Sequence, residues 1–219
     1  MTASRACLLI HGFTGGPYEI QPLADELKQW GWECCVPLLP GHEQLPDSLR
    51  HVVWQDWAAA IDDEAGRLVE AYGAFDLVGF SMGGLLAAYA ARRHPVRRLV
   101  LLNTALIYFS PGRMLREWNN RMWDGVWDLP GKWRTTPVQA AWQFTRLVRH
   151  MKGEFEAIQA PTLIIQGQRD QVAHPFGAQL IKRRLHCEHK LMTFPRSRHL
   201  ICHDVEADLV HHAVRQFLQ

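Results

Sequence analysis

Short runs of hydrophobic residues alternate along this chain with longer stretches whose hydrophobic residues recur at helical spacing. Several short runs are apolar throughout, which is typical of strands buried on both faces of a parallel sheet. The longer stretches have the pattern of amphipathic helices. Strands are predicted over residues 7–11, 33–38, 75–80, 98–103, 162–166 and 189–194. Helices are predicted over residues 18–30, 54–72, 82–93, 175–186 and 203–218.

This alternation predicts an α/β fold with a doubly wound parallel sheet of about six strands and right-handed crossovers. Reactive residues are then expected just beyond the carboxyl ends of the strands. We expect residues 1–219 to form a single domain, because the length suits one hydrophobic core.

One segment interrupts the alternation. Residues 104–158 separate the fourth and fifth predicted strands, whereas a usual connection has about 2–6 residues. We expect a small helical cap here, inserted within the domain and lying over the active site. The segment is rich in tryptophan, which suits either an apolar acyl chain or the packing of a lid onto its base. Its tryptophans are Trp118, Trp123, Trp127, Trp133 and Trp142.

Composition and charge narrow the choice of partners. The net charge of +2 with neutral histidines gives no argument for binding nucleic acid or an anionic membrane. No apolar stretch reaches the roughly 18 residues of a membrane span, and the first apolar run is too short for a signal peptide. The five cysteines are an odd number and lack Cys-x-x-Cys spacing, which argues against a disulfide framework or a zinc site. A cytoplasmic location is therefore predicted.

The pattern Gly-x-Ser-x-Gly follows the third predicted strand, at Gly79-Phe80-Ser81-Met82-Gly83. Small residues allow a turn from strand to helix so sharp that the hydroxyl of Ser81 stands exposed at its tip. The N-terminal N–H groups of the next helix point at the same place, where an oxyanion could form. The pentapeptide also occurs by chance in turns, so its context decides its meaning.

That context supplies a base and an acid in the required order. In hydrolases with this turn, an acid and then a histidine follow the serine. Asp170 lies just after the fifth predicted strand, and His199 lies between the last strand and the last helix. The alternatives are weaker: Asn103 places no carboxylate after the fourth strand, and Asp204 is expected at the start of the last helix. The predicted catalytic residues are Ser81, Asp170 and His199.

An oxyanion hole needs two N–H donors. One is expected from Met82, the residue after the nucleophile, and the other from the loop after the first strand. That loop, residues 11–17, reads His-Gly-Phe-Thr-Gly-Gly-Pro, and the N–H of Phe13 is the expected donor. A phosphate-binding loop is the competing interpretation, but the loop has neither Gly-x-Gly-x-x-Gly nor a Gly-Lys-Ser/Thr ending.

Together these residues resemble the α/β-hydrolase superfamily, and most of all small bacterial carboxylesterases of the Bacillus/Geobacillus type and monoacylglycerol lipases. Further marks are Pro-Gly-His at 40–42, Trp-Gln-Asp-Trp at 54–57 and Ala-Pro-Thr at 160–162. The resemblance implies a Ser81–His199–Asp170 triad, an oxyanion hole of Phe13 and Met82 N–H groups, a small cap, and neither cofactor nor metal. It also implies a small-molecule ester substrate with an apolar acyl group.

The chain departs from this family in one place near the base. Relatives usually have Ser-Gly-His before the last helix, whereas this chain has Ser197-Arg198-His199. Arg198 adds a cation that would either lower the pKa of His199 or point to solvent. A carboxylesterase is the leading hypothesis. A monoacylglycerol lipase, a thioesterase or a carbon–carbon bond hydrolase would use the same residues, and a non-catalytic binding protein on the same fold is the remaining alternative.

Overall fold

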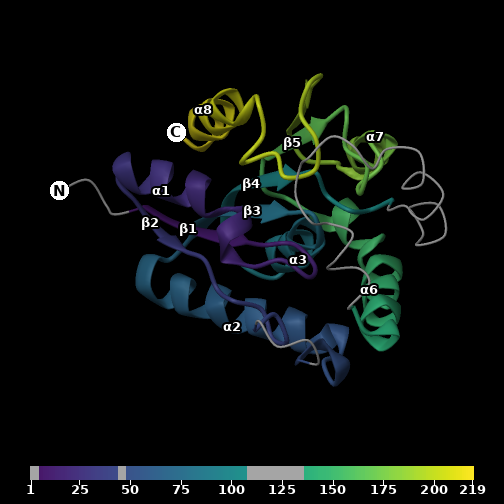
Figure 1. Ribbon diagram of the computed structural model, residues 1–219. Helices are drawn as coiled ribbons and strands as arrows, with labels where there is room; N and C mark the ends of the chain where they lie inside the picture. The colour runs from purple at the N-terminus through teal and green to yellow at the C-terminus, as the bar shows by residue number, and fades with distance from the viewer. Residues whose placement is uncertain (1–4, 44–47, 108–135) are drawn as a thin grey trace.

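A computed structural model describes residues 5–43, 48–107 and 136–219 of the chain. These residues form one parallel sheet of six strands in the order β2-β1-β3-β4-β5-β6 (Figure 1). The predicted α/β fold with a doubly wound sheet is therefore confirmed. The strands are β1 (Arg5–Ile10), β2 (Trp32–Cys35), β3 (Phe75–Phe80), β4 (Val96–Leu102), β5 (Thr162–Gly167) and β6 (His189–Phe194).

Helices cover both faces of the sheet. Helices α1 (Gln21–Gln29) and α8 (Ala207–Leu218) lie on one face, and α2 (Trp54–Tyr72) and α3 (Met82–Ala91) lie on the other (Figure 1). Helix α7 (Phe176–Arg184) shares the hydrophobic core of α2 and α3. The remaining helical segments among the described residues are α6 (Val138–Met151) and three 3-10 turns, η1 (Pro17–Glu19), η2 (Ser48–Arg50) and η3 (Glu154–Ala157).

The apolar strands divide their side chains between two cores. Along β1, Cys7 and Leu9 join the core under α1 and α8, whereas Leu8 and Ile10 join the core under α2 and α3. All four are fully buried, because successive side chains of a strand point to opposite faces and both faces are covered. This explains why the strands are apolar without alternation.

The strand register brings the carboxyl ends of the strands to one edge. Ile10 pairs with Gly79, and Phe80 pairs with Leu102. Farther along the sheet, Gly167 pairs with Phe194. The loops that follow β1, β3, β5 and β6 therefore leave the sheet side by side, which is where the sequence places the candidate residues.

Three predicted elements have different limits for identifiable reasons. Strand β2 ends at Cys35, two residues before Pro37, which has no N–H to donate to a ladder. The helix predicted over 18–30 is divided into η1 and α1, and each begins with a proline in its first two positions. The last helix begins at Ala207, because Asp204 accepts hydrogen bonds from the N–H groups of Arg198 and Val205 in a turn before it.

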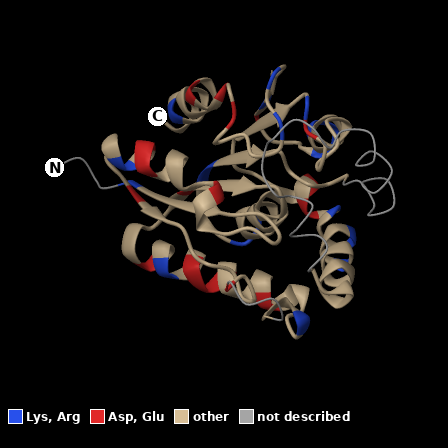
Figure 2. Cartoon of the chain, viewed as in Figure 1, with Lys and Arg blue, Asp and Glu red and all other residues tan. Residues whose placement is uncertain are grey.

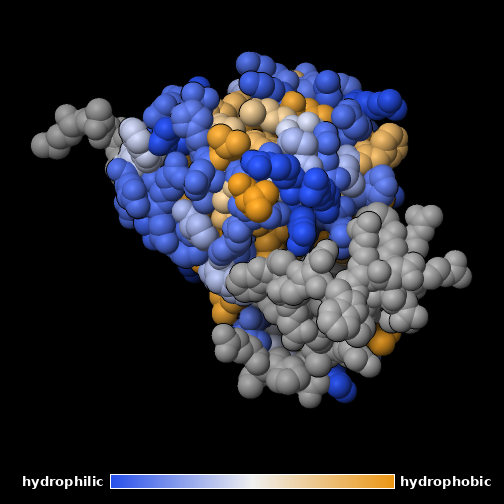
Figure 3. All heavy atoms as spheres, turned by 45° about the horizontal axis from the view of Figure 1, so that its top comes forward, coloured by the Kyte–Doolittle hydropathy of each residue, from blue (hydrophilic) through white to orange (hydrophobic). Residues whose placement is uncertain are grey.

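Charged residues of both signs lie on the outer helices (Figure 2). Among the coloured residues of the face shown in Figure 3, hydrophilic residues predominate and hydrophobic residues lie between them. Within the described residues, no helix combines the length and the apolar composition that crossing a bilayer requires.

Candidate active site

Ser81 occupies the turn between β3 and α3 in a strained backbone conformation. Its φ is 54° and its ψ is −115°, and such conformations cost about 1–3 kcal/mol for a residue other than glycine. The neighbouring glycines allow the turn. A Cβ at Gly79 would clash with the carbonyl of Gly83, and a Cβ at Gly83 would clash with the carbonyl of Ile10. The Gly-x-Ser-x-Gly spacing is thus needed for close packing of β3, α3 and the end of β1.

The three predicted catalytic side chains form one hydrogen-bonded chain. The Nε2 atom of His199 lies 3.1 Å from Ser81 Oγ, and its Nδ1 atom lies 2.8 Å from Asp170 Oδ2. All three residues are buried. The arrangement lets the imidazole accept a proton from the hydroxyl on one side while the carboxylate orients the ring on the other.

Backbone N–H groups fix the orientation of the acid. Oδ1 of Asp170 accepts hydrogen bonds from the N–H groups of Val172 at 2.8 Å and Ala173 at 2.9 Å. Oδ2 is thereby left directed at His199. These contacts hold the carboxyl group in the orientation in which Oδ2 meets the imidazole of His199.

The pKa of His199 is raised above its ordinary value. Burial lowers it, but the charge of Asp170, the hydrogen bond to Asp170 and the charge of Glu19 together more than offset this effect. Arg198, which stands where relatives usually have glycine, has an exposed side chain. Of the two sequence alternatives, a lowered pKa is wrong and a side chain in solvent agrees with the structure.

Asn103 ties together the loops that carry the acid and the base. It is fully buried, and its left-handed φ of 43° ends β4. Its side-chain amide donates to the carbonyl oxygens of Arg198 at 2.9 Å and His199 at 2.8 Å. Its Oδ1 accepts from the N–H of Gly167 at 2.7 Å. The sequence analysis noted only that Asn103 offers no carboxylate after the fourth strand. Nothing in the neighbouring sequence indicates that its side chain connects these two loops.

The loop after β1 lies against the nucleophile. A Cβ added to Gly12 would stand 3.3 Å from the Cβ of Ser81. His11 holds this loop from one side: its Nε2 accepts the N–H of Leu39 at 3.1 Å, so its Nδ1 carries the proton and donates to the Gly12 carbonyl at 2.9 Å. Burial, followed by the nearby His42, lowers the pKa of His11 to about 3, which keeps it neutral.

The His11 contact has a consequence for Phe13. The Gly12 carbonyl and the Phe13 N–H belong to the same planar trans peptide unit, so they point in opposite directions. Fixing the carbonyl therefore fixes the direction of the Phe13 N–H. Met82 is the first residue of α3, where the N–H has no partner within the helix. Met82 directly follows Ser81 in the chain, and Phe13 directly follows Gly12, whose added Cβ would stand 3.3 Å from the Cβ of Ser81.

An aromatic cluster surrounds the Phe13 ring. Phe144 of α6 stacks on it with ring centroids 5.0 Å apart and 8° between the planes. Trp57 of α2 and His42 meet it edge to face, at 5.8 Å and 6.2 Å. All four side chains of the cluster are buried and pack beside the oxyanion loop. The cluster also joins α6, which belongs to the predicted cap segment, to the body of the fold.

The tryptophan-rich segment is described only in part. Trp118, Trp123, Trp127 and Trp133 lie outside the described residues, so their predicted role near the substrate stays a prediction. Trp142 is 58% exposed, and the guanidinium of Arg146 lies 4.8 Å from its ring centroid. Because its side chain is exposed, Trp142 has neither of the two predicted roles, packing a lid onto its base or contacting a buried acyl chain.

Comparison with known proteins shows which family the chain is similar to. The model of the alpha/beta hydrolase family matches residues 7–213. The thermostable monoacylglycerol lipase of Bacillus sp. (strain H-257) is 27% identical over 214 residues, covering 93% of this chain and 86% of that protein. The carboxylesterase of Bacillus subtilis (strain 168) is 25% identical over 227 residues, covering 98% and 92%.

A solved structure extends the comparison to three dimensions. A structure from work on LipS and LipT, two metagenome-derived lipolytic enzymes, has a TM-score of 0.85 to this chain at 25% identity. The match covers 99% of this chain and 94% of that one. With a family match over nearly its whole length and a sheet of the corresponding topology, this chain belongs to the α/β hydrolase family.

Proposed function

We propose that this protein is a serine carboxylesterase that hydrolyses short- to medium-chain carboxylic esters through an acyl-enzyme intermediate. The observation that carries the proposal is the hydrogen-bonded chain from Ser81 through His199 to Asp170. The similarity to a carboxylesterase and a monoacylglycerol lipase supports the same class of substrate.

Acylation begins with Ser81 as the nucleophile. As Oγ attacks the ester carbonyl carbon, His199 Nε2 takes the hydroxyl proton, and Asp170 stabilises the resulting imidazolium. The N–H groups of Phe13 and Met82 donate to the oxyanion of the tetrahedral intermediate. The intermediate collapses when the bond to the alcohol oxygen breaks. His199 gives its proton to that oxygen, and the alcohol leaves.

Deacylation repeats these steps with water. His199 removes a proton from water as the water oxygen attacks the acyl carbon, and the same two N–H groups bind the second oxyanion. The bond to Ser81 Oγ then breaks, Oγ takes back the proton from His199, and the carboxylic acid is released. These steps draw only on side chains, backbone N–H groups and water, so the proposal needs no cofactor.

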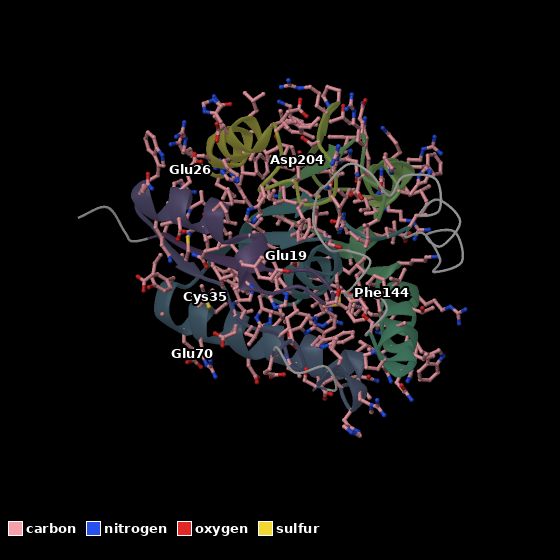
Figure 4. All side chains as sticks on the ribbon, viewed as in Figure 1. Glu19, Glu26, Cys35, Glu70, Phe144 and Asp204 are labelled. Carbon is pink, nitrogen blue, oxygen red and sulfur yellow. The ribbon has the colours of Figure 1, made fainter. Side chains whose placement is uncertain are left out.

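The apolar acyl group is proposed to bind beside the aromatic cluster of Phe13, Trp57 and Phe144. These rings adjoin the oxyanion loop and are supplied by three separate parts of the fold. We further propose that residues 104–158 form the cap, with α6 as its described helix. Phe144 is on the side of α6 that faces the body of the molecule (Figure 4).

Loss of the nucleophile provides the main test. Ser81→Ala is expected to lower the turnover of p-nitrophenyl butyrate by about 10⁴-fold or more and to abolish labelling by a fluorophosphonate, detected by mass spectrometry. Ser48→Ala, which changes a serine outside the proposed machinery, should retain both. Normal turnover by Ser81→Ala, or a label on another residue, would rule out the proposal.

A monoacylglycerol lipase is the second candidate, supported by the relative from Bacillus sp. and by the aromatic cluster. Rates on p-nitrophenyl esters of increasing chain length, compared with monoacylglycerols and acyl thioesters, separate the alternatives. A maximum kcat/KM on short to medium simple esters supports the carboxylesterase. Preference for long-chain monoacylglycerols supports the lipase, and preference for thioesters contradicts both.

A further inference from the structure

Glu19 is a buried carboxylate next to the proposed catalytic residues. It is the last residue of η1, directly after the oxyanion loop, and only 8% of its surface is exposed. Figure 4 shows it near the centre of the molecule. Carboxylates are rarely buried this deeply unless they are paired or hydrogen-bonded, so the position of Glu19 requires a physical reason.

The oxyanion loop folds around this carboxylate. Glu19 Oε2 accepts a hydrogen bond from the N–H of Gly12 at 2.9 Å. A Cβ on Gly12 would stand 3.0 Å from the same oxygen, and a Cβ on Gly15 would overlap the carboxylate group. Gly12 and Gly15 are therefore needed because a side chain at either position would meet the Glu19 carboxylate. At Gly12, a side chain would also approach Ser81.

Glu19 and His11 hold adjacent peptide units of the loop. Glu19 accepts the N–H of Gly12, and His11 donates to the carbonyl of Gly12. With both backbone groups of Gly12 engaged, the following peptide unit, which carries the N–H of Phe13, has little freedom to rotate. A donor that is already oriented when charge develops gives the largest electrostatic stabilisation of a transition state.

Glu19 also acts on His199 through its charge. After burial, which lowers the pKa of His199, the charge of Asp170 and its hydrogen bond raise it, and the charge of Glu19 raises it further. Cys202 also lies near Glu19. Burial, with a smaller contribution from Glu19, raises the pKa of this thiol to about 12, so it stays uncharged. In the described part of the chain, the charges that act on His199 are therefore Asp170 and Glu19.

We infer that Glu19 is a positioning residue with two effects, the first on the oxyanion loop and the second on the base. Its carboxylate holds the Gly12 N–H and so orients the Phe13 donor, and its negative charge stabilises the imidazolium that forms on His199. The inference rests on the proposed function, because it assigns Glu19 to the same acyl-transfer site.

Two substitutions separate these effects. Glu19→Gln keeps an oxygen that accepts the Gly12 N–H but removes the charge, and it has nearly the same shape. It should lower kcat for p-nitrophenyl butyrate by about 3- to 10-fold and move the acid limb of the kcat/KM profile to lower pH, because the pKa of His199 falls. Glu19→Ala removes both effects and should lower kcat by about 100-fold or more with little change in KM.

Asp76→Asn is the matched control, since Asp76 is a buried carboxylate that pairs with Arg5 and Arg97 at the amino end of β3, the opposite end of that strand from Ser81. It should leave kcat and the pH profile as in the wild type. A Glu19→Gln enzyme with the wild-type acid limb, or a Glu19→Ala enzyme that folds and keeps wild-type kcat, would overturn the inference. A wild-type protein that neither hydrolyses the ester nor labels at Ser81 would instead overturn the proposed function.

Discussion

Backbone strain in the described chain gathers around the candidate site. Thr14, Ser81 and Asn103 are the non-glycine residues with positive φ among the described residues, at 59°, 54° and 43°. One lies in the oxyanion loop, one is the proposed nucleophile, and one clamps the loops of the base and the acid. At about 1–3 kcal/mol each, such conformations persist only where the surrounding structure enforces them. The close packing of Gly79 and Gly83 does so for Ser81, and side-chain hydrogen bonds to neighbouring loops do so for Asn103.

The raised pKa of His199 predicts where activity is lost on acidification. The imidazole must be neutral to take the proton of Ser81, and a group with a raised pKa becomes protonated at a higher pH. The acid limb of kcat/KM should therefore have its midpoint above about 6.5, the pKa of an unperturbed histidine. Initial rates of p-nitrophenyl butyrate hydrolysis between pH 5 and 9 measure it. A midpoint well below 6.5, or a flat profile, would contradict the proposed role of His199.

At the scale of elements, the site depends on how β3 and α3 pack at the turn formed by residues 79–83. Gly79 lies in β3, and a side chain there would meet the backbone of Gly83 and the side chain of Ala87 in α3. Gly66 lies within α2, where a Cβ would meet nothing within 4 Å. Packing therefore requires a glycine at position 79, whereas packing leaves room for a side chain at position 66.

The same substitution should therefore have opposite effects at these two positions. Gly66→Ala is expected to stabilise the protein by about 1 kcal/mol, because alanine favours a helix interior over glycine. Gly79→Ala should destabilise it by several kcal/mol, since α3 must move away from β3, and should also remove activity. Urea denaturation followed by circular dichroism gives both values. Equal stabilities for the two variants would show that the turn between β3 and α3 tolerates a wider separation of the strand and the helix.

The sequence predicts the six strands well, because strands depend on local hydrophobic runs. It also places Ser81, Asp170 and His199 in loops that the fold brings within hydrogen-bond distance of one another. It does not reveal Asn103 or Glu19 as parts of the site. Both act through contacts with loops distant in sequence: Asn103 bonds to the carbonyl of His199, and Glu19 was predicted within a helix that in fact begins after it. Such roles arise from tertiary packing and leave no periodic signal.

On the scale of the whole molecule, the two edges of the sheet have different tasks. The carboxyl edge holds the candidate site, and the amino edge holds a cluster of charges around Asp76. This residue is fully buried and accepts a hydrogen bond from Trp32 Nε1 at 2.8 Å. Arg5 and Arg97 lie 3.6 Å and 3.5 Å from its carboxylate, and Arg5 also donates to the carbonyl of Leu218. The cluster joins β1, β2, β3 and β4 to the end of α8.

This separation predicts that stability and catalysis can be changed independently. Asp76→Ala should lower the free energy of unfolding by about 3 kcal/mol, because it leaves a buried indole N–H unpaired and two guanidinium groups without their counter-ion. For a domain of this size, the corresponding fall in Tm is about 6–12 °C.

Below its unfolding temperature, the Asp76→Ala enzyme should keep the wild-type kcat/KM, since Trp32, Arg5 and Arg97, the described polar partners of Asp76, lie at the amino edge. Asp25→Ala is the matched control, because Asp25 forms an exposed ion pair with Lys28 at 3.8 Å. Its loss should change stability by less than about 1 kcal/mol. Thermal denaturation and initial rates measured on the same preparations test both statements. A fall in kcat/KM at 20–25 °C, where the variant is still folded, would show that the amino edge influences the site through the sheet.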